Sequence, residues 1–311
     1  MVQCLYKNGR VIEGIVMIQV RYAIVIVTYN REQLLRECIN RAVDQTVRAA
    51  SIIVVNNAST DGTNAYLQEL KKESEVYDIV NLQQNIGGAG GFAKGIECAV
   101  KKNMECVLLI DDDAILANNY MELLLCARRT QTTYQAFAGC VKTNNIIDIF
   151  HRRMVSKVGI RFRNCPEQEY QKSFFLCEVA SFCGMLLDSS LIKQIGLPHS
   201  EYFIWHDDAE YSLRVRKYSK FVVVTNAILD HKTKQNVTLY PRRYDWKDYY
   251  AVRNRIWMLK EHGTIVDRIV NWMDLFVNVI FRNWWFGLVR RDGYDWKNER
   301  DIVKKAMRDA R

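Results

Sequence analysis

Hydrophobic residues in the first 120 positions alternate between short unbroken runs and runs with helical spacing. Tyr22–Thr28 is an unbroken run rich in β-branched residues, which is typical of a strand buried on both faces. In Arg31–Val43 the apolar residues recur every three or four positions, which indicates a helix with one buried face. The alternation continues with strands over Ser51–Val55, Ile79–Leu82 and Val107–Ile110, and with helices over Asn64–Leu70 and from the glycines near 90 to about Lys101. It predicts an α/β fold with a parallel, doubly wound sheet.

The pattern changes after residue 120. A helix over Met121–Arg129 leads into mixed, antiparallel strands that end near Leu187, and a further strand begins at Phe221. From Trp246 onward the chain is mostly helical and rich in Trp, Arg and Lys. We therefore expect an N-terminal extension over 1–21, an α/β domain over 22–240 and a helical region over 241–311.

Three consecutive aspartates stand at the end of the fourth predicted strand. Asp111 and Asp113 share one side of an extended backbone, whereas Asp112 points away. A cation relieves the repulsion between such carboxylates. Hard oxygen ligands suit Mg²⁺ or Mn²⁺, and these ions usually hold the phosphates of a substrate as well. The pattern predicts a metal site, with a solvated acidic turn as the alternative.

Other polar residues also follow strands, where the ligands of parallel sheets bind. Asn57 follows the second strand and could hydrogen-bond a base or ribose, while helix capping explains Ser59, Thr60 and Asp61 equally well. The glycine-rich turn that begins at Asn85 opens a helix whose amide groups attract phosphate. Lys94 suits either a diphosphate or solvent.

A second acidic group follows an aromatic stretch at the start of a predicted helix. Trp205 offers a flat apolar surface for a sugar ring, and Asp208 beside it is placed to act as a general base. Asp207 and Glu210 share this helix start, where acidic residues also complement the helix dipole. His231 ends the last strand and suits either a metal site or a structural role.

Composition narrows the choice of partners. Lys and Arg number 44 against 35 Asp and Glu, and the net charge of +9 favours anionic partners such as nucleotides or phospholipid surfaces. Basic and aromatic residues are not interleaved as in an RNA-binding sheet, so nucleic acid is not expected.

Nine dispersed cysteines without a Cys-x-x-Cys pair predict reduced, buried thiols. Because the start is not signal-like and no stretch of about 18 residues is free of charge, we expect a cytoplasmic protein.

Six motifs occur in order with fitting spacing: Val27–Asn30, Asn56–Gly62, Asn85–Gly91, Asp111–Asp113, Trp205–Glu210 and Asp230–His231. Together they resemble the inverting glycosyltransferases of family 2, which have the GT-A fold, a Rossmann-like fold for nucleotide-diphosphate sugars. The third and fifth motifs look most like the bacterial galactofuranosyltransferase branch, with rhamnosyltransferases close behind. The likeness covers about residues 22–255, including Tyr249-Tyr250 and Arg253-Asn254.

The resemblance implies transfer of a sugar, with inversion, from a nucleotide-diphosphate donor to a cell-surface or lipid-linked glycan. Galactofuranose from UDP-galactofuranose is the favoured donor sugar, and rhamnose from dTDP-rhamnose is the alternative. Asp208 would be the catalytic base. The metal ligands for Mn²⁺ or Mg²⁺ would be Asp111, Asp113 and His231, and the acceptor residues Trp205, Asp207 and Glu210. Nucleotide-sugar contacts are implied for Thr28, Tyr29, Asn30, Asn57, Asn85, Gly87, Gly88, Lys94, Asp111 and Asp112.

Two positions depart from the pattern of these relatives. Asn57 stands where many of them have an aspartate near the nucleobase, and His206 separates the usual Trp from the Asp-Asp pair. The first change bears on the nucleobase contact, and the second bears on the shape of the pocket.

The segment Ile265–Val289 combines apolar residues and Trp with Arg268 and Arg282, and Arg290-Arg291 follows it. Such helices can lie in the interface of an anionic membrane, which would suit a lipid-linked acceptor. Packing on the α/β domain or on a second subunit of a homo-oligomer explains the same pattern.

Two other classes of protein match the sequence less well. A nucleotidyltransferase also uses strand-end aspartates, but it would need a basic, phosphate-gripping loop after the first strand, where this chain has only Thr28-Tyr29-Asn30-Arg31. A non-catalytic binding module would have no use for the carboxylates of Asp111, Asp113 and Asp208.

Overall fold

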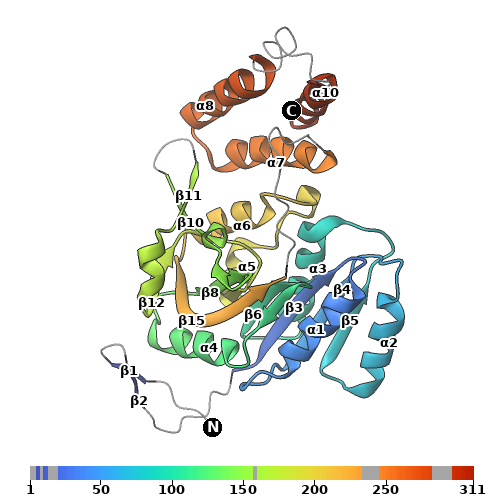
Figure 1. The fold of residues 1–311 in the computed structure, drawn as a ribbon, viewed down its shortest axis with the longest axis vertical. Coiled ribbons are helices and arrows are strands. Elements are labelled where there is room, and N and C mark those ends of the chain that lie inside the picture. Colours follow the sequence, from blue (N-terminus) through green and yellow to red (C-terminus); the bar gives the residue numbers. More distant parts are fainter. Residues whose placement is uncertain (1–4, 8–9, 13–19, 157–159, 233–244, 282–295) are drawn as a thin grey trace.

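A mixed sheet runs through the centre of the molecule with helices on both faces (Figure 1). The computed structural model describes residues 5–7, 10–12, 20–156, 160–232, 245–281 and 296–311. The parallel half of the sheet has the spatial order β6 (Cys106–Asp111), β3 (Tyr22–Thr28), β4 (Ser51–Asn56) and β5 (Tyr77–Asn81). This order confirms the expected parallel, doubly wound arrangement.

The sequence of β3 explains why helices cover both faces of the sheet. Its side chains alternate between the faces, and all seven residues are buried. Tyr22, Ile24 and Ile26 pack on the face covered by α1 (Glu32–Val43), α2 (Thr63–Glu73) and α4 (Tyr120–Thr130). Ala23, Val25 and Val27 pack on the face covered by α3 (Gly87–Lys101), α5 (Ser189–Ile195) and α6 (Asp207–Val215).

Antiparallel strands enter the sheet in its second half, as the pattern after residue 120 predicted. Strand β14 (Met185–Asp188) lies antiparallel between β6 and β8 (Ala136–Thr143). Strand β15 (Phe221–His231) runs parallel to β8 and carries β12 (Phe174–Cys177) on its outer side. A small separate sheet joins β10 (Arg152–Val155), β11 (Phe162–Asn164) and β13 (Val179–Ala180).

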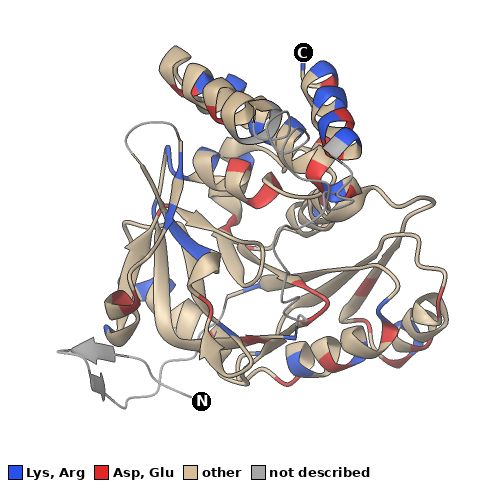
Figure 2. Cartoon of the chain, turned by 45° about the horizontal axis from the view of Figure 1, so that its top comes forward, with Lys and Arg blue, Asp and Glu red and all other residues tan. Residues whose placement is uncertain are grey.

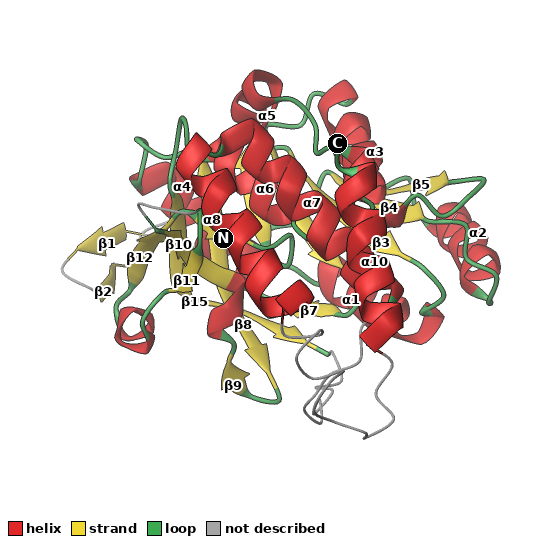
Figure 3. Ribbon diagram, turned by 90° about the horizontal axis from the view of Figure 1, so that it is seen from above, coloured by secondary structure: helices red, strands yellow, loops and turns green. Residues whose placement is uncertain are grey.

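A helical group follows the sheet, as expected for the C-terminal region. It comprises α7 (Trp246–His262), α8 (Ile265–Leu275), a π-helical turn over Phe276–Phe281, and α10 (Trp296–Asp309). These helices lie together on one side of the α/β domain, and α7 contacts α6 (Figure 2, Figure 3). Among the described residues, no helix is long and apolar enough to cross a membrane.

The proposed domain limits stay predictions. Residues 233–244, which contain the limit at 240, and residues 282–289 of the candidate membrane segment lie outside the described residues. In the N-terminal extension, β1 (Leu5–Lys7) and β2 (Arg10–Ile12) form an antiparallel pair. All eight described cysteines carry free thiols, and seven of them are buried.

Candidate functional site

The strand-end aspartates meet His231 because of a local strand pairing. Asp111 is the last residue of β6, and the chain then turns into β7 (Ala114–Leu116). Strand β7 pairs antiparallel with the end of β15, which places His231 opposite Ala114. The Nε2 atom of His231 lies 3.2 Å from Oδ1 of Asp113. Ligand atoms of Asp111, Cys183 and His231 lie within 4.8 Å of one another.

These residues fit a divalent cation. Nδ1 of His231 is buried and has no hydrogen-bond partner among the described residues, which is costly unless a ligand or water satisfies it. Burial, together with the neighbouring charge of Asp113, raises the pKa of Asp111 to about 7. Two carboxylates and an imidazole suit Mn²⁺ or Mg²⁺. Burial raises the pKa of the Cys183 thiol, so this softer group stays protonated.

Asp112 does not point away from its neighbours, contrary to the expectation from an extended backbone. Its Oδ2 accepts a hydrogen bond from Thr28 Oγ1 at 2.8 Å, and its Oδ1 lies 3.2 Å from the guanidinium of Arg31. Arg31 also contacts Asp113 at 2.7 Å. The strand ends at Asp111, so the alternation of a strand no longer holds at Asp112 and Asp113. Asp112 and Thr28 tie the ends of β6 and β3 together, and both are buried.

Asn57 supports the glycine-rich turn instead of presenting a free amide to a base. Its Nδ2 donates to the carbonyl of Gly87, and its Oδ1 accepts from the amide of Ile86, both at 2.9 Å. The side chain is buried. Asn85 also serves this turn, since its Oδ1 accepts from the amide of Gly87. Gly87 has a φ of 75°, a conformation that favours glycine.

The other residues implied in nucleotide-sugar binding differ in their exposure and in their contacts. Gly88 has open space where a side chain would begin, so a ligand can approach its backbone. Tyr29 is 44% exposed. Asn30 fixes the next loop, because its Oδ1 accepts from the amide of Thr60 at 2.7 Å. Lys94 forms an exposed ion pair with Glu97 at 3.2 Å, and the structure does not bring it to the pocket.

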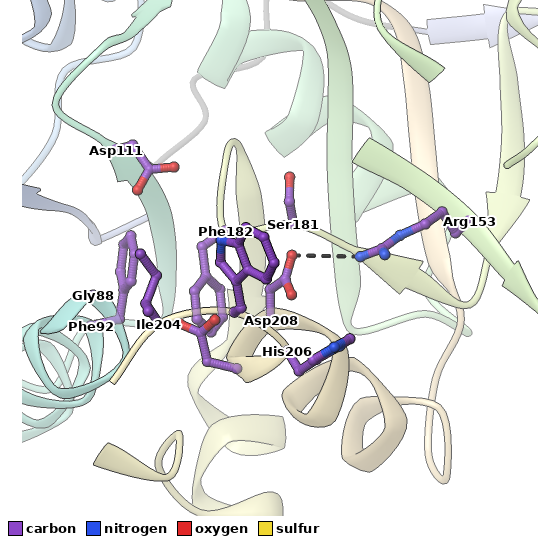
Figure 4. A pocket seen from close by; sticks show the side chains of 11 residues that line it. Gly88, Phe92, Asp111, Arg153, Ser181, Phe182, Ile204, His206 and Asp208 are labelled. Carbon is purple, nitrogen blue, oxygen red and sulfur yellow. Dashed lines mark ion pairs between the residues drawn. The ribbon is translucent and has the colours of Figure 1, made fainter. Parts of the chain in front are cut away.

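Asp111 and Asp208 enter the same pocket from different elements, strand β6 and helix α6 (Figure 4). The pocket has a volume of about 420 Å³. A guanidinium nitrogen of Arg153, which lies in β10, is 3.6 Å from Oδ2 of Asp208. The lining residues are Gly88, Phe92, Asp111, Arg153, Ser181, Phe182, Ile204, Trp205, His206, Asp207 and Asp208. Asp111 of the predicted metal site, Gly88 of the glycine-rich turn and the predicted base Asp208 therefore line one cavity.

The loop over residues 202–206, called the pocket loop below, leads to Asp207 and Asp208 and has an unusual backbone. Phe203, Trp205 and His206 have φ values of 63°, 66° and 63°, which cost free energy for residues with a Cβ atom. At Phe203 the amide of Ile204 donates to the carbonyl of Tyr202, a strained γ-turn. Such strain persists only where surrounding contacts impose it.

Asn254 of α7 supplies those contacts. Its Nδ2 lies 2.7 Å, 2.9 Å and 2.8 Å from the carbonyl oxygens of Tyr202, Ile204 and Trp205. The side chain is fully buried. The neighbouring Arg253 donates to the carbonyl of Glu201 at 2.6 Å. The pocket loop is thus held from the C-terminal helices, about 50 residues along the chain.

Asp207, at the start of α6, has a strongly shifted pKa. Burial, and then the charge of Asp208, raises the pKa of Asp207 to about 8. Asp207 is therefore mostly a neutral carboxylic acid at pH 7, and in that form it cannot accept a proton. Burial lowers the pKa of His206 to about 3, so its ring is neutral.

Glu210 does not lie at the pocket, contrary to its implied role with the acceptor. It is 1% exposed, and its oxygens contact His262 at 2.9 Å and Arg214 at 2.8 Å. Burial alone would raise the pKa of Glu210, but His262 and Arg214 lower it. The contact with His262 turns the Glu210 side chain towards α7 instead of the pocket.

Three residues of the site were not among the sequence candidates. Arg31 contacts two aspartates at the metal end, Arg153 faces Asp208, and Asn254 holds the pocket loop. The motif Arg253-Asn254 was the only signal for the last of these. Arg153 lies in a strand without a motif, so nothing in the sequence pointed to it.

Comparisons with known proteins identify the family of this chain. The model of a family described as glycosyl transferase family 2 matches residues 23–196. The galactofuranosyltransferase GlfT1 of Mycolicibacterium smegmatis is 25% identical over 86% of this chain and 90% of that protein. The dTDP-rhamnosyl transferase RfbF of Shigella flexneri is 24% identical over 76% of this chain and 79% of that protein. EpsH of Bacillus subtilis is 24% identical, and the chain spans 59% of its length.

Solved structures show the same fold at low identity. GalNAc-T7 with UDP, GalNAc and Mn²⁺ superposes with a TM-score of 0.63 at 14% identity, over 78% of this chain and 48% of that chain. S. aureus TarS 1–349 in complex with UDP-GlcNAc gives a TM-score of 0.57 at 14% identity, over 93% of this chain and 80% of that chain. The α/β domain therefore has the GT-A fold.

Proposed function

Because this chain belongs to glycosyl transferase family 2, we propose that it transfers galactofuranose from UDP-galactofuranose to a cell-surface or lipid-linked glycan, with inversion and with a divalent metal. The single observation that carries the proposal is that Asp111 and Asp208 line one pocket. Asp111 suits a metal ion that holds the diphosphate of the donor, and Asp208 suits the attacking hydroxyl of the acceptor.

The donor side of the pocket is built to receive a diphosphate. Asp111, Asp113 and His231 would hold the ion, which when bound would neutralise the diphosphate as it leaves with the nucleotide. The open backbone at Gly88, near the start of α3, lets a phosphate approach the helix amides. Arg31 is half exposed beside the same aspartates and adds positive charge for an anionic ligand. Mn²⁺ and UDP in the similar GalNAc-T7 structure support a metal and a nucleotide in this fold.

The acceptor side would supply the base. Asp208 would take the proton from an acceptor hydroxyl while that oxygen bonds to the anomeric carbon and the bond from this carbon to the diphosphate breaks. Attack from the face opposite the leaving group inverts the anomeric centre. Arg153, 3.6 Å from Asp208, is placed to orient this carboxylate. Trp205 lines the pocket and is 37% exposed, so its ring can pack against a sugar. A positioned general base is typically worth about 10²–10⁴-fold in rate.

Rhamnose from dTDP-rhamnose is the second candidate, supported by the similarity to RfbF. Donor hydrolysis and transfer would be measured with both nucleotide sugars, with Mn²⁺ and with EDTA. We expect metal-dependent turnover of UDP-galactofuranose that Asp208→Asn removes. Turnover of dTDP-rhamnose alone would establish the second candidate, and metal-independent turnover would contradict the proposed metal role.

We also propose that the C-terminal helices rest on an anionic membrane surface on the cytoplasmic side. The exposed apolar residues of α8 and the turn after it are Ile265, Val266, Ile269, Trp272, Met273, Phe276, Val277 and Phe281. Lys and Arg gather on the adjacent α10 (Figure 2), so apolar and basic groups lie side by side, which suits anionic lipid.

Co-sedimentation of the full chain with anionic and with neutral vesicles tests this placement. We expect binding to anionic vesicles only, and weaker binding for Ile269→Glu. If the chain instead forms dimers that Ile269→Glu dissociates and ignores both vesicles, the apolar face is a subunit interface.

A further inference from the structure

A second cluster of metal-binding side chains lies outside the pocket, where three segments meet. His199 precedes the short helix η3 (Ser200–Tyr202), Glu210 lies in α6, and Glu261 and His262 lie in the last turn of α7. Ligand atoms of His199, Glu210 and Glu261 lie within 4.8 Å of one another. None of these four residues has a part in the proposed transfer.

The separations between these side chains match those around a small ion. Nε2 of His199 lies 3.4 Å from Glu261 and 3.9 Å from Glu210. Nε2 of His262 lies 3.7 Å from Glu261 and 2.9 Å from Glu210. Bonds of about 2.0–2.1 Å in a tetrahedral Zn²⁺ site separate neighbouring ligands by about 3.3–3.4 Å. The ligand atoms of His199, Glu210 and Glu261 are therefore spaced for one ion, and Nε2 of His262 lies beside both glutamates.

An unsatisfied atom points into the cluster. Nε2 of His199 is buried and has no hydrogen-bond partner among the described residues. The side chains of Glu210 and His262 are 1% and 4% exposed. An imidazole nitrogen that faces two carboxylates and makes no hydrogen bond is costly without a ligand.

The charge of the cluster also favours a cation. Arg214 contacts one oxygen of Glu210 at 2.8 Å and leaves the other oxygen facing the histidines. Among the carboxylates and guanidinium in contact here, the two glutamates exceed the single arginine by one negative charge. A cavity of about 340 Å³, lined in part by His199 and Glu261, reaches the cluster. Glu261 is 43% exposed, so an ion has access from solvent.

We propose that His199, Glu210, Glu261 and His262 bind Zn²⁺ in a structural site separate from the transfer pocket. Each added imidazole favours Zn²⁺ over Mg²⁺ or Ca²⁺, which take mainly oxygen ligands, so two imidazoles with two carboxylates suit Zn²⁺ best. The ion joins η3 and α6 to the end of α7. It fixes α6, the helix that carries Asp208, against the end of α7.

The test measures Zn²⁺ binding in the full chain with the transfer site disabled by Asp111→Asn and His231→Ala. Bound metal is counted by mass spectrometry after dialysis, and Co²⁺ is used as an absorbing substitute for Zn²⁺. We expect one ion per chain in this background, a strong visible band typical of tetrahedral Co²⁺, and retention against excess Mg²⁺.

Two further substitutions in that background identify the ligands. His199→Asn and Glu261→Gln change partly exposed side chains, so the variants are expected to fold, which circular dichroism checks. Each should weaken Zn²⁺ binding at least ten-fold, whereas Glu97→Gln, in α3 and paired with Lys94 and Lys101, should leave it unchanged. No bound Zn²⁺ in the background variant, or equal affinity in His199→Asn and Glu261→Gln, would overturn the proposal and leave an ordinary buried ion-pair cluster.

Discussion

Replacing Asn254 with alanine should uncouple sugar transfer from nucleotide binding. The amide of Asn254 contacts three carbonyl oxygens of the pocket loop. With only two N–H groups, it contributes about 1–3 kcal/mol net, at about 0.5–1.5 kcal/mol per hydrogen bond. Against this, the three positive-φ residues store about 1–3 kcal/mol each. The stored strain is at least as large as the anchoring, so the loop should relax once the amide is gone.

Relaxation of the loop moves Trp205 and the start of α6, and therefore Asp208, but leaves the donor end of the pocket on β6 and β15. We expect kcat/KM to fall by about 10²-fold or more, equivalent to about 2.7 kcal/mol. UDP affinity with Mn²⁺, measured by calorimetry, should change less than about three-fold, which is under 0.7 kcal/mol. Because released strain offsets lost hydrogen bonds, the Tm should fall by only about 2–6 °C.

Asn271→Ala provides a matched control. Asn271 is also buried and accepts a hydrogen bond from Arg255 of α7 at 2.6 Å, but it lies in α8 and does not touch the loop. It should lower the Tm similarly while transfer continues. Near-normal transfer in Asn254→Ala, or equal losses of transfer and of UDP affinity, would refute the positioning role.

Four further predictions concern the acidic residues. Asp208→Asn should keep UDP affinity and lose about 10²–10⁴-fold in transfer rate; ordinary turnover would place the base elsewhere. Asp113→Ala should abolish Mn²⁺-dependent UDP binding in calorimetry, and an unchanged affinity would count against the metal role. The pKa of Asp111 is about 7, and the pKa of His231 is raised because its contact with Asp113 outweighs burial; both groups must lose a proton before a metal binds, so Mn²⁺ affinity should rise with pH through about 7; a flat profile would contradict this. Asp207 has a folded pKa of about 8, far above its ordinary value, so it destabilises the metal-free fold increasingly as pH rises from about 4 to 8; Asp207→Asn should therefore raise the Tm more at pH 8 than at pH 5, and equal shifts would be inconsistent with the raised pKa.

The parallel half of the sheet could be read from the sequence because its signal is local. The run Tyr22–Thr28 coincides with β3, since a strand buried on both faces needs apolar residues at every position. Helix and strand boundaries elsewhere differ by a few residues, as at β5, which begins at Tyr77 rather than Ile79.

The positions of the site residues depended on contacts that no local pattern contains. Asn57 was expected to face a base, but its amide is used by the Ile86–Gly87 backbone of the next loop. Glu210 was expected at the acceptor, but its partner His262 lies 52 residues away. Arg153 reaches Asp208 only because the small sheet containing β10 lies beside the pocket. Motif order located the strand ends correctly, whereas side-chain direction required the tertiary structure.

A crystal soaked with UDP and Mn²⁺ would show directly whether the strand-end aspartates hold a metal and a nucleotide. We expect one Mn²⁺ bound by Asp111, Asp113 and His231, with the diphosphate on the ion and Asp208 across the pocket with space for a sugar between them. Nucleotide bound away from these aspartates, or Mn²⁺ that leaves Asp113 and His231 without a ligand, would contradict it.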